Sequence, residues 1–324
     1  MTRTGRRNRL ATTMLTPPPE TLLPMKLNRA KATFGRHETF PLRYGWLPKG
    51  FEALADDPEI FTRPEDAMIR LGVGRNMVNA IHYWLQVTGL VSFDGGRGKP
   101  TRLGTALLGT RGDHYLEDDA TLWILHWLIA SNAESATGFF WFFNRFPMPR
   151  FRDADALRAI GEFTEQELKA PRSASTLKSD ISTLLRMYAA EEGRTDEHLD
   201  SPFAQLGLVE SDPDAGYRSL RSARPALPPV ALQFALAQRF AAQPQQPALP
   251  MRVVLYSDEG WAAPSAVFRL TEDGLMTGLA RVVEQDPRSY ELRDTAGVHQ
   301  LYRRGEVIDP IDILSLHYRG RAAA

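Results

Sequence analysis

The segment from residue 62 to residue 107 constrains the fold of this chain more than any other. Its apolar spacing predicts a short helix from Pro64 to about Arg70 and a stronger helix from Arg75 to about Thr88. Between them, Gly72 and Gly74 supply the backbone freedom that a tight turn requires. The segment therefore predicts a helix-turn-helix.

A hairpin is expected to follow the second helix. Leu90 to Phe93 has the composition of a strand, residues 94–100 form a glycine-rich loop, and Thr101 to Leu107 is the returning segment. The loop contains a proline and does not open a helix, so it is not a nucleotide-binding phosphate loop. Helix, turn, helix and hairpin in this order are typical of a winged helix, whose second helix has the dimensions to enter a DNA major groove.

The second helix divides into an apolar face and a polar face. The apolar positions recur at helical spacing and are expected to pack against the preceding helices: Met77, Ile81, Trp84, Leu85 and Thr88. The polar side presents Asn76, Asn79 and Tyr83, with Arg75 at the N-terminal end. Asparagine can pair with adenine, and arginine with guanine, through two hydrogen bonds each. We therefore expect this side to contact DNA.

Cations near this helix extend the expected DNA contact. The glycine-rich loop carries Arg97 and Lys99, and Arg102 follows it. Arg36 and Arg43 come from an aromatic, basic segment ahead of the first helix. Because winged helices also pack against protein, the pattern alone leaves a purely structural module open.

The charge of the chain is balanced, with 39 basic and 39 acidic residues among 324. No field of the whole molecule therefore draws it onto DNA, and any binding must come from a local patch. The chain has no cysteine, which excludes disulfides, thiol catalysis, thiolate zinc sites and a persulfide-carrying role. No run of about 18 apolar residues is present, so the sequence predicts no membrane span and we expect a cytoplasmic protein.

The pattern as a whole predicts a mainly α fold with small β-hairpins (α+β). The basic N-terminal stretch is expected to be a disordered leader, with Met25 as an alternative start. A helix at about residues 271–283 and hairpin strands at 289–293 and 298–303 mark a winged-like unit at the C-terminal end. The expected boundaries are 1–30 for the leader, 31–110 for the winged helix-turn-helix, 111–242 for a helical domain, 243–250 for a linker and 251–324 for the C-terminal helix-plus-hairpin domain.

Several short motifs resemble those of a known family. They are Arg36 to Phe40, Trp46-Leu47, Leu71 to Val78, Leu116 to Asp118, Thr121 to Trp123, His126-Trp127, Leu199 to Phe203, Leu206 to Leu208 and Asp294 to Gly297. On these motifs the chain resembles an uncharacterised bacterial domain family that includes the SspB component of single-strand DNA phosphorothioation systems. In such systems sulfur replaces one backbone oxygen of DNA, and the modification marks DNA for defence.

The resemblance implies a DNA-binding protein of such a modification system, with DNA nicking as its proposed activity. It also implies two partners, a cysteine desulfurase and an ATP-using sulfur-transfer protein. Mg²⁺ is the cofactor that we expect if the chain nicks DNA. Three alternatives stay open: a DNA-binding scaffold without enzymatic activity, a transcriptional regulator acting as a homodimer, and an adaptor that binds only protein.

Two adjacent pairs of residues are candidates for a nicking site. His37 lies beside Glu38 among cations, where an imidazole could act as a general base near phosphate. Neighbouring residues on a strand point to opposite faces, however, so a structural segment is the competing interpretation. Glu117 and Asp118, followed by Asp119, could hold magnesium. Acidic residues at a helix start also serve as caps, which is the ordinary interpretation.

Other carboxylates form weaker patterns. Asp119 shares a helix face with His126. Asp155 followed by Glu167 and Lys169 fits a nuclease pattern in spacing only, because that stretch is predicted to be helical. Three alternating residues, Asp196, His198 and Asp200, could be ligands or ordinary turn and cap groups.

Overall fold

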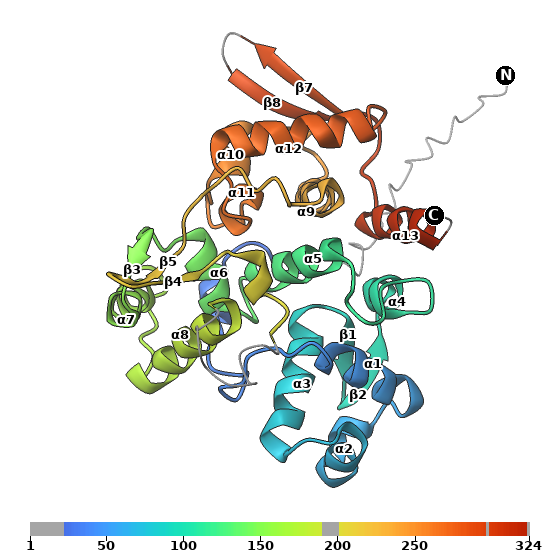
Figure 1. Ribbon diagram of the computed structural model, residues 1–324, viewed down its shortest axis with the longest axis vertical. Coiled ribbons are helices and arrows are strands. Elements are labelled where there is room, and N and C mark those ends of the chain that lie inside the picture. The colour runs from blue at the N-terminus through green and yellow to red at the C-terminus, as the bar shows by residue number, and fades with distance from the viewer. Residues whose placement is uncertain (1–22, 190–200, 296–297, 323–324) are drawn as a thin grey trace, which may run out of the picture.

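The computed structural model describes residues 23–189, 201–295 and 298–322 of the chain. In Figure 1 three helical units follow one another from the blue N-terminal unit through the green middle unit to the orange C-terminal unit. Small antiparallel sheets accompany these units. The expected fold class, mainly α with small β-hairpins, is therefore confirmed.

The first unit contains the expected pair of helices and the hairpin. Its elements are η1 (Arg29–Lys31), α1 (Trp46–Asp56), η2 (Ile60–Thr62), α2 (Pro64–Leu71), α3 (Arg75–Val87), β1 (Val91–Asp94), β2 (Arg97–Pro100) and α4 (Arg102–Leu108). Gly72 ends α2 in a left-handed conformation with φ of 68°, and its N–H bonds to the carbonyl of Met68. This turn lets α3 begin at Arg75, as the sequence predicted.

The hairpin is tighter than we expected. β1 and β2 pair antiparallel, and the last pair joins Asp94 to Arg97, so only Gly95 and Gly96 form the turn. Both glycines have positive φ, 57° and 86°, which a two-residue hairpin turn favours. The predicted loop of residues 94–100 is therefore mostly strand.

The segment predicted to return in the hairpin, residues 101–107, forms the N-cap and most of helix α4 instead. The Thr101 hydroxyl caps this helix by accepting a hydrogen bond from the N–H of Gly104 at 3.0 Å. Gly104 also lets the helix approach β1 closely, because an added Cβ there would lie 2.1 Å from the carbonyl oxygen of Leu90. Cap and close approach together explain why the chain turns into a helix directly after β2.

The middle unit surrounds α5. Its elements are α5 (Asp119–Ala130), α6 (Thr137–Asn144), β3 (Arg150–Phe151), α7 (Asp153–Glu162), the π-helical η3 (Phe163–Glu167), α8 (Ala174–Tyr188), η4 (Ala204–Leu206), β4 (Glu210–Asp212) and β5 (Gly216–Arg218). Every residue of α5 from Ala120 to Ala130 is buried, as expected for a helix that is apolar on all sides. Even so, no helix among the described residues is long and apolar enough to cross a membrane.

The third unit carries the second hairpin. Its elements are α9 (Pro229–Ala242), β6 (Ala248–Pro250), α10 (Met251–Leu255), α11 (Pro264–Val267), α12 (Glu272–Gln285), β7 (Tyr290–Thr295) and β8 (Val298–Arg303). The strands form an antiparallel sheet in the order β6-β8-β7. The predicted linker of residues 243–250 therefore ends in a strand, because β6 pairs with β8.

A last helix, α13 (Pro310–Ala322), was not predicted and returns to the first unit. It contacts α4 as well as α9 (Figure 1). Its Tyr318 hydroxyl hydrogen-bonds that of Thr121 at 2.7 Å. Asp118 at the start of α5 contacts His317 and Arg321 of α13 at 2.6 Å each. These contacts hold α13 against the start of α5.

Part of the predicted disordered leader lies in the fold. The carbonyl of Met25 accepts a hydrogen bond from the N–H of Ala262, and the N–H of Leu27 donates to the carbonyl of Gly260, both at 2.9 Å. The Met25 side chain is buried. Ordered structure thus begins at least as early as residue 23 rather than near residue 31.

Candidate nucleic-acid interface

The exposed face of α3 is the centre of the candidate interface. Arg75, Asn76 and Asn79 are exposed, as the sequence predicted. Gln86 is exposed further along the helix, and His82 between them is half-buried. Positions 75, 79, 82 and 86 fall on one helical face. Arginine, asparagine and glutamine can all read base edges. Asn76 is exposed beside this face. We call Arg75, Asn76, Asn79 and Gln86 the α3 stripe.

Tyr83 does not belong to this stripe. Its side chain is 8% exposed, and its hydroxyl donates to the carbonyl of Ser135 at 3.0 Å. Its neighbour Trp84 donates from Nε1 to the carbonyl of Phe40 at 3.2 Å. α3 therefore packs on a second side, against segments outside the first helices. Contrary to our prediction, Tyr83 is not available for a base contact.

The back of α3 agrees largely with the predicted apolar face. Ile81, Trp84, Leu85 and Thr88 are buried, whereas Met77 is only half-buried. The Thr88 hydroxyl donates to the carbonyl of Trp84 at 2.7 Å, so this buried polar group is satisfied. The packed back holds the α3 stripe outward.

Two cations lie on the exposed face of the hairpin beside α3. Arg97 and Lys99 share this face with Ser92 and Asp94. Arg97 is 67% exposed and lies 3.4 Å from Glu59. Such an exposed pair is weak and can yield to a phosphate. The hairpin therefore presents cations as predicted, although on strands rather than on a loop.

The N-terminal end of α3 favours negative charge. Its N-cap is Gly74, no side chain caps it, and its first turn holds no acidic residue. The free N–H groups of a helix start and its dipole attract anions such as phosphate. Arg75 adds a formal positive charge at the same end.

Arg36 and Arg43 lie in the segment before α1. Arg36 is exposed. Arg43 is half-buried, and its guanidinium carbon lies 5.4 Å from the ring centre of Trp46, within cation–π range. Arg36 is the better placed of the two for a phosphate contact.

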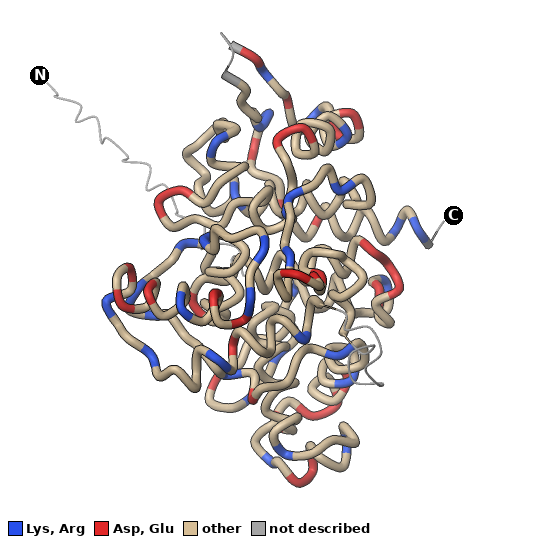
Figure 2. Tube along the Cα trace, turned by 60° about the vertical axis from the view of Figure 1, so that its left-hand side comes forward, with Lys and Arg blue, Asp and Glu red and all other residues tan. Residues whose placement is uncertain are grey.

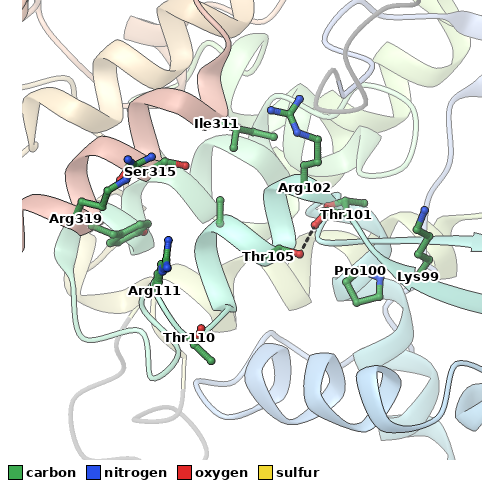
Figure 3. A pocket seen from close by; sticks show the side chains of 12 residues that line it. Lys99, Pro100, Thr101, Arg102, Thr105, Thr110, Arg111, Ile311, Ser315 and Arg319 are labelled. Atoms are coloured by element: carbon green, nitrogen blue, oxygen red, sulfur yellow. Dashed lines mark hydrogen bonds between the residues drawn. The ribbon is translucent and has the colours of Figure 1, made fainter. Parts of the chain in front are cut away.

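A basic pocket of about 460 Å³ lies between the end of β2, α4 and α13 (Figure 3). Its cationic lining residues are Lys99, Arg102, Arg111 and Arg319. Its hydroxyl-bearing lining residues are Thr101, Thr105, Thr110, Ser315 and Tyr318. In Figure 3 Arg111 and Arg319 lie toward one end, Lys99 toward the other, and Arg102 between them. Lys99 and Arg102 are among our predicted contact residues, whereas the sequence did not single out Arg111 or Arg319, which line the same pocket.

His37 and Glu38 do not form a catalytic pair. The His37 side chain is 1% exposed, and its Nδ1 accepts a hydrogen bond from the N–H of Thr39 at 3.2 Å. Nε2 therefore carries the proton and donates to Asp180 Oδ1 at 2.8 Å. Both ring nitrogens are occupied, whereas Glu38 is exposed in a left-handed conformation with φ of 52°. The structure therefore does not bring the two side chains together.

Asp118 caps α5 and joins it to α13. Its carboxylate caps α5 by accepting a hydrogen bond from the N–H of Ala120 at 2.9 Å. Burial alone would raise its pKa, but the contacts with His317, Ala120 and Arg321 outweigh burial and lower the pKa to about 2. The adjacent Glu117 is exposed.

This acidic segment does not fit a magnesium ion, which takes oxygen ligands in a near-octahedral arrangement. The buried Asp113 carboxylate is occupied by the N–H groups of Glu117 and Asp118, each at 2.9 Å. Within residues 23–189, 201–295 and 298–322, no group of three His, Cys, Asp or Glu side chains could hold a metal ion.

The predicted partner of the acidic segment, His126, lies in the core. Its Nε2 donates to the carbonyl of Val267 at 2.9 Å, and its Nδ1 accepts from the Tyr188 hydroxyl at 2.7 Å. Burial lowers the pKa of His126 to about 3. Because Asp119 is exposed, the two side chains do not form a joint site.

The nuclease-like pattern of Asp155, Glu167 and Lys169 does not form a site either. Asp155 caps α7 by accepting a hydrogen bond from the N–H of Arg152 at 3.0 Å. Glu167 ends the π-helical η3, and Lys169 follows it with φ of 56°, so neither lies on a sheet edge. Residues 196, 198 and 200 lie outside the described part of the chain.

Two solved structures share this architecture. A magnesium ion-bound SspB structure is 26% identical, covers 92% of this chain and 92% of its own, and has a TM-score of 0.78. An SspB structure at 25% identity covers 91% of this chain and 92% of its own, also with a TM-score of 0.78. None of the curated proteins matches the chain. The family described as "Protein of unknown function (DUF4007)" matches residues 34–318, and the chain belongs to that family.

Proposed function

We propose that this protein is the DNA-binding component of a bacterial DNA phosphorothioate modification system. Its similarity to two SspB structures, over 92% and 91% of the chain, supports a role in such a system, because SspB is a component of single-strand DNA phosphorothioation systems. The α3 stripe supports the DNA contact. It places base-reading side chains on the exposed face of a helix whose back is packed.

The proposed docking follows the geometry of a winged helix. The α3 stripe enters the major groove, while Arg97 and Lys99 of the hairpin lie over the flanking phosphates. The uncapped start of α3 meets a backbone phosphate. Base contacts then supply sequence preference, and phosphate contacts supply most of the affinity.

The test replaces Asn79 by alanine and measures duplex binding by fluorescence anisotropy. Asn79→Ala removes one base-reading side chain, so we expect affinity for the preferred sequence to fall about 10-fold to 100-fold and sequence preference to relax. Lys99→Ala is expected to weaken binding about equally for all sequences, because it removes a phosphate contact.

Gln166→Ala is the matched control. Gln166 is an exposed amide on η3 of the middle unit, away from α3, and its replacement is expected to leave binding unchanged. If Asn79→Ala and Arg75→Ala both bind DNA as the wild type does, α3 is not the reading helix and the proposal fails.

Nicking is a second, separate proposal that comes from the family resemblance. The similarity to a magnesium-bound SspB supports testing it with Mg²⁺. Supercoiled plasmid is incubated with the protein, with and without a chelator and with the desulfurase and the ATP-using sulfur-transfer partner. Open-circular product that requires Mg²⁺ supports a nickase. Binding without any nicked product, with the partners present, supports the non-enzymatic scaffold instead.

A further inference from the structure

The pocket between β2, α4 and α13 gathers positive charge without an acid among its lining residues. Four cations, Lys99, Arg102, Arg111 and Arg319, line about 460 Å³, and no lining residue is Asp or Glu. Like charges gathered in one pocket repel one another. The arrangement is unusual in a chain whose charges balance, and whose acidic and basic residues are otherwise interspersed (Figure 2).

The cations at the α13 end lack ionic partners in the described structure. Arg319 donates from Nε to the carbonyl of Ser315 at 3.1 Å, within its own helix. Arg111 is exposed and forms no ion pair with a described residue. Both guanidinium groups can therefore take an anion without first releasing a carboxylate. Planar guanidinium groups match the geometry of phosphate oxygens.

Arg102 differs, because Asp309 competes for it. Arg102 Nη1 lies 2.9 Å from Asp309 Oδ2. Asp309 also accepts a hydrogen bond from the N–H of Ile311 at 2.9 Å, which caps the start of α13. The carboxylate therefore holds α13 in place and neutralises one cation at the edge of the pocket.

We propose that this pocket binds a backbone phosphate of the same nucleic acid that α3 contacts, beyond the segment that α3 reads. The inference rests on the proposed function. Lys99 and Pro100 belong both to the pocket and to the hairpin strand that carries Arg97. A DNA strand that contacts the hairpin would therefore continue past Arg111 and Arg319. The apolar side chains of Pro100, Ala106 and Ile311 offer a surface to the adjoining sugar.

The first arm of the experiment removes the cations that lack ionic partners. Arg111→Gln and Arg319→Gln are each expected to lower affinity for duplex DNA about tenfold at about 0.1 M salt, and to reduce the salt slope by about 1. The control is Arg158→Gln, which replaces another exposed arginine, on α7, that pairs with Asp155. It is expected to change neither quantity.

The second arm predicts an effect of opposite sign. Asp309→Asn removes the competing charge but keeps an oxygen that can accept from Ile311, so α13 stays capped. Arg102 is then free for phosphate, and affinity is expected to rise about twofold to fivefold. Thermal unfolding of each variant confirms that it is folded. If the pocket had only a structural role, the arginine variants would not lose DNA affinity while Asp309→Asn gains it.

The third arm separates a nucleic-acid backbone from free anions. Inorganic phosphate and a nucleoside monophosphate are titrated at constant ionic strength and followed by thermal shift. If Arg111→Gln and Arg319→Gln abolish saturable binding of a free anion yet leave DNA binding unchanged, the pocket serves small anions and the inference is overturned. If Asn79→Ala weakens DNA binding but the pocket variants do not, the inference fails and the proposed function stands. If the wild type binds no DNA, both the proposed function and the inference about the pocket are wrong.

Discussion

His126 shows how a residue that could bind a metal is instead used in the core. Its two ring nitrogens are satisfied by the Val267 carbonyl and the Tyr188 hydroxyl, and the side chain is buried. The sequence shows that a histidine lies within an expected helix. It does not show that the acceptor lies on a distant segment, 141 positions away. A histidine on an apolar helix is therefore ambiguous until the tertiary contact is known.

We predict that His126 makes the fold sensitive to acid. Its pKa is about 3 in the folded protein and 6.5 in the unfolded chain, so the unfolded state takes up the proton first as pH falls. Its contribution to stability is complete above about pH 6.5 and is lost progressively toward pH 3. At pH 5 the loss is about 2 kcal/mol. The stability difference between wild type and His126→Gln, measured by chemical denaturation, should narrow by that amount between pH 7 and pH 5. A constant difference would contradict this account.

At the scale of the element, helix α3 shows what periodicity can and cannot predict. The apolar back of the helix was predicted correctly at Ile81, Trp84 and Leu85, because these residues recur at helical spacing. The exposed face was misplaced toward Tyr83. Tyr83 is buried, and its hydroxyl bonds to the carbonyl of Ser135, 52 positions away, a contact that local spacing cannot predict. The correct continuation of the stripe is Gln86.

We predict opposite effects for two alanine substitutions at glycines. Gly72 has φ of 68° with nothing within 4 Å of an added Cβ, so Gly72→Ala costs only backbone strain, about 1 kcal/mol. Gly161 lies within helix α7, has no positive φ and also has open space around it. Gly161→Ala should therefore stabilise by up to about 1 kcal/mol. Thermal unfolding of both variants provides the measurement. If both substitutions changed the stability in the same direction, the assignment of strain to the α2–α3 turn would be refuted.

At the scale of the whole molecule, the basic pocket depends on chain segments that are far apart in sequence. Lys99, Arg102 and Arg111 come from the first unit, and Arg319 comes from a helix that follows the third. The sequence predicts cations beside the hairpin, because they adjoin it. It cannot predict that α13 returns to α4, since this depends on contacts of Asp118 and Thr121 with α13, and of Arg102 with Asp309 just before α13. The fold class was therefore predictable, but the composite part of the candidate site was not.

The balanced charge of the molecule leads to a final prediction about salt. With 39 basic and 39 acidic residues, attraction to DNA must come from the local cations, and distant charges matter only where screening is weak. The Debye length is about 8 Å at 0.15 M salt and about 30 Å at 0.01 M. Lys99→Glu should therefore lower DNA affinity at both salt concentrations. Arg158→Glu should have an effect only at the lower one, because Figure 1 places α7 across the molecule from α4 and α13. Equilibrium titrations followed by fluorescence anisotropy at both salt concentrations give the comparison. Equal losses for both variants at 0.15 M would mean that binding follows the net charge of the molecule and not the proposed interface.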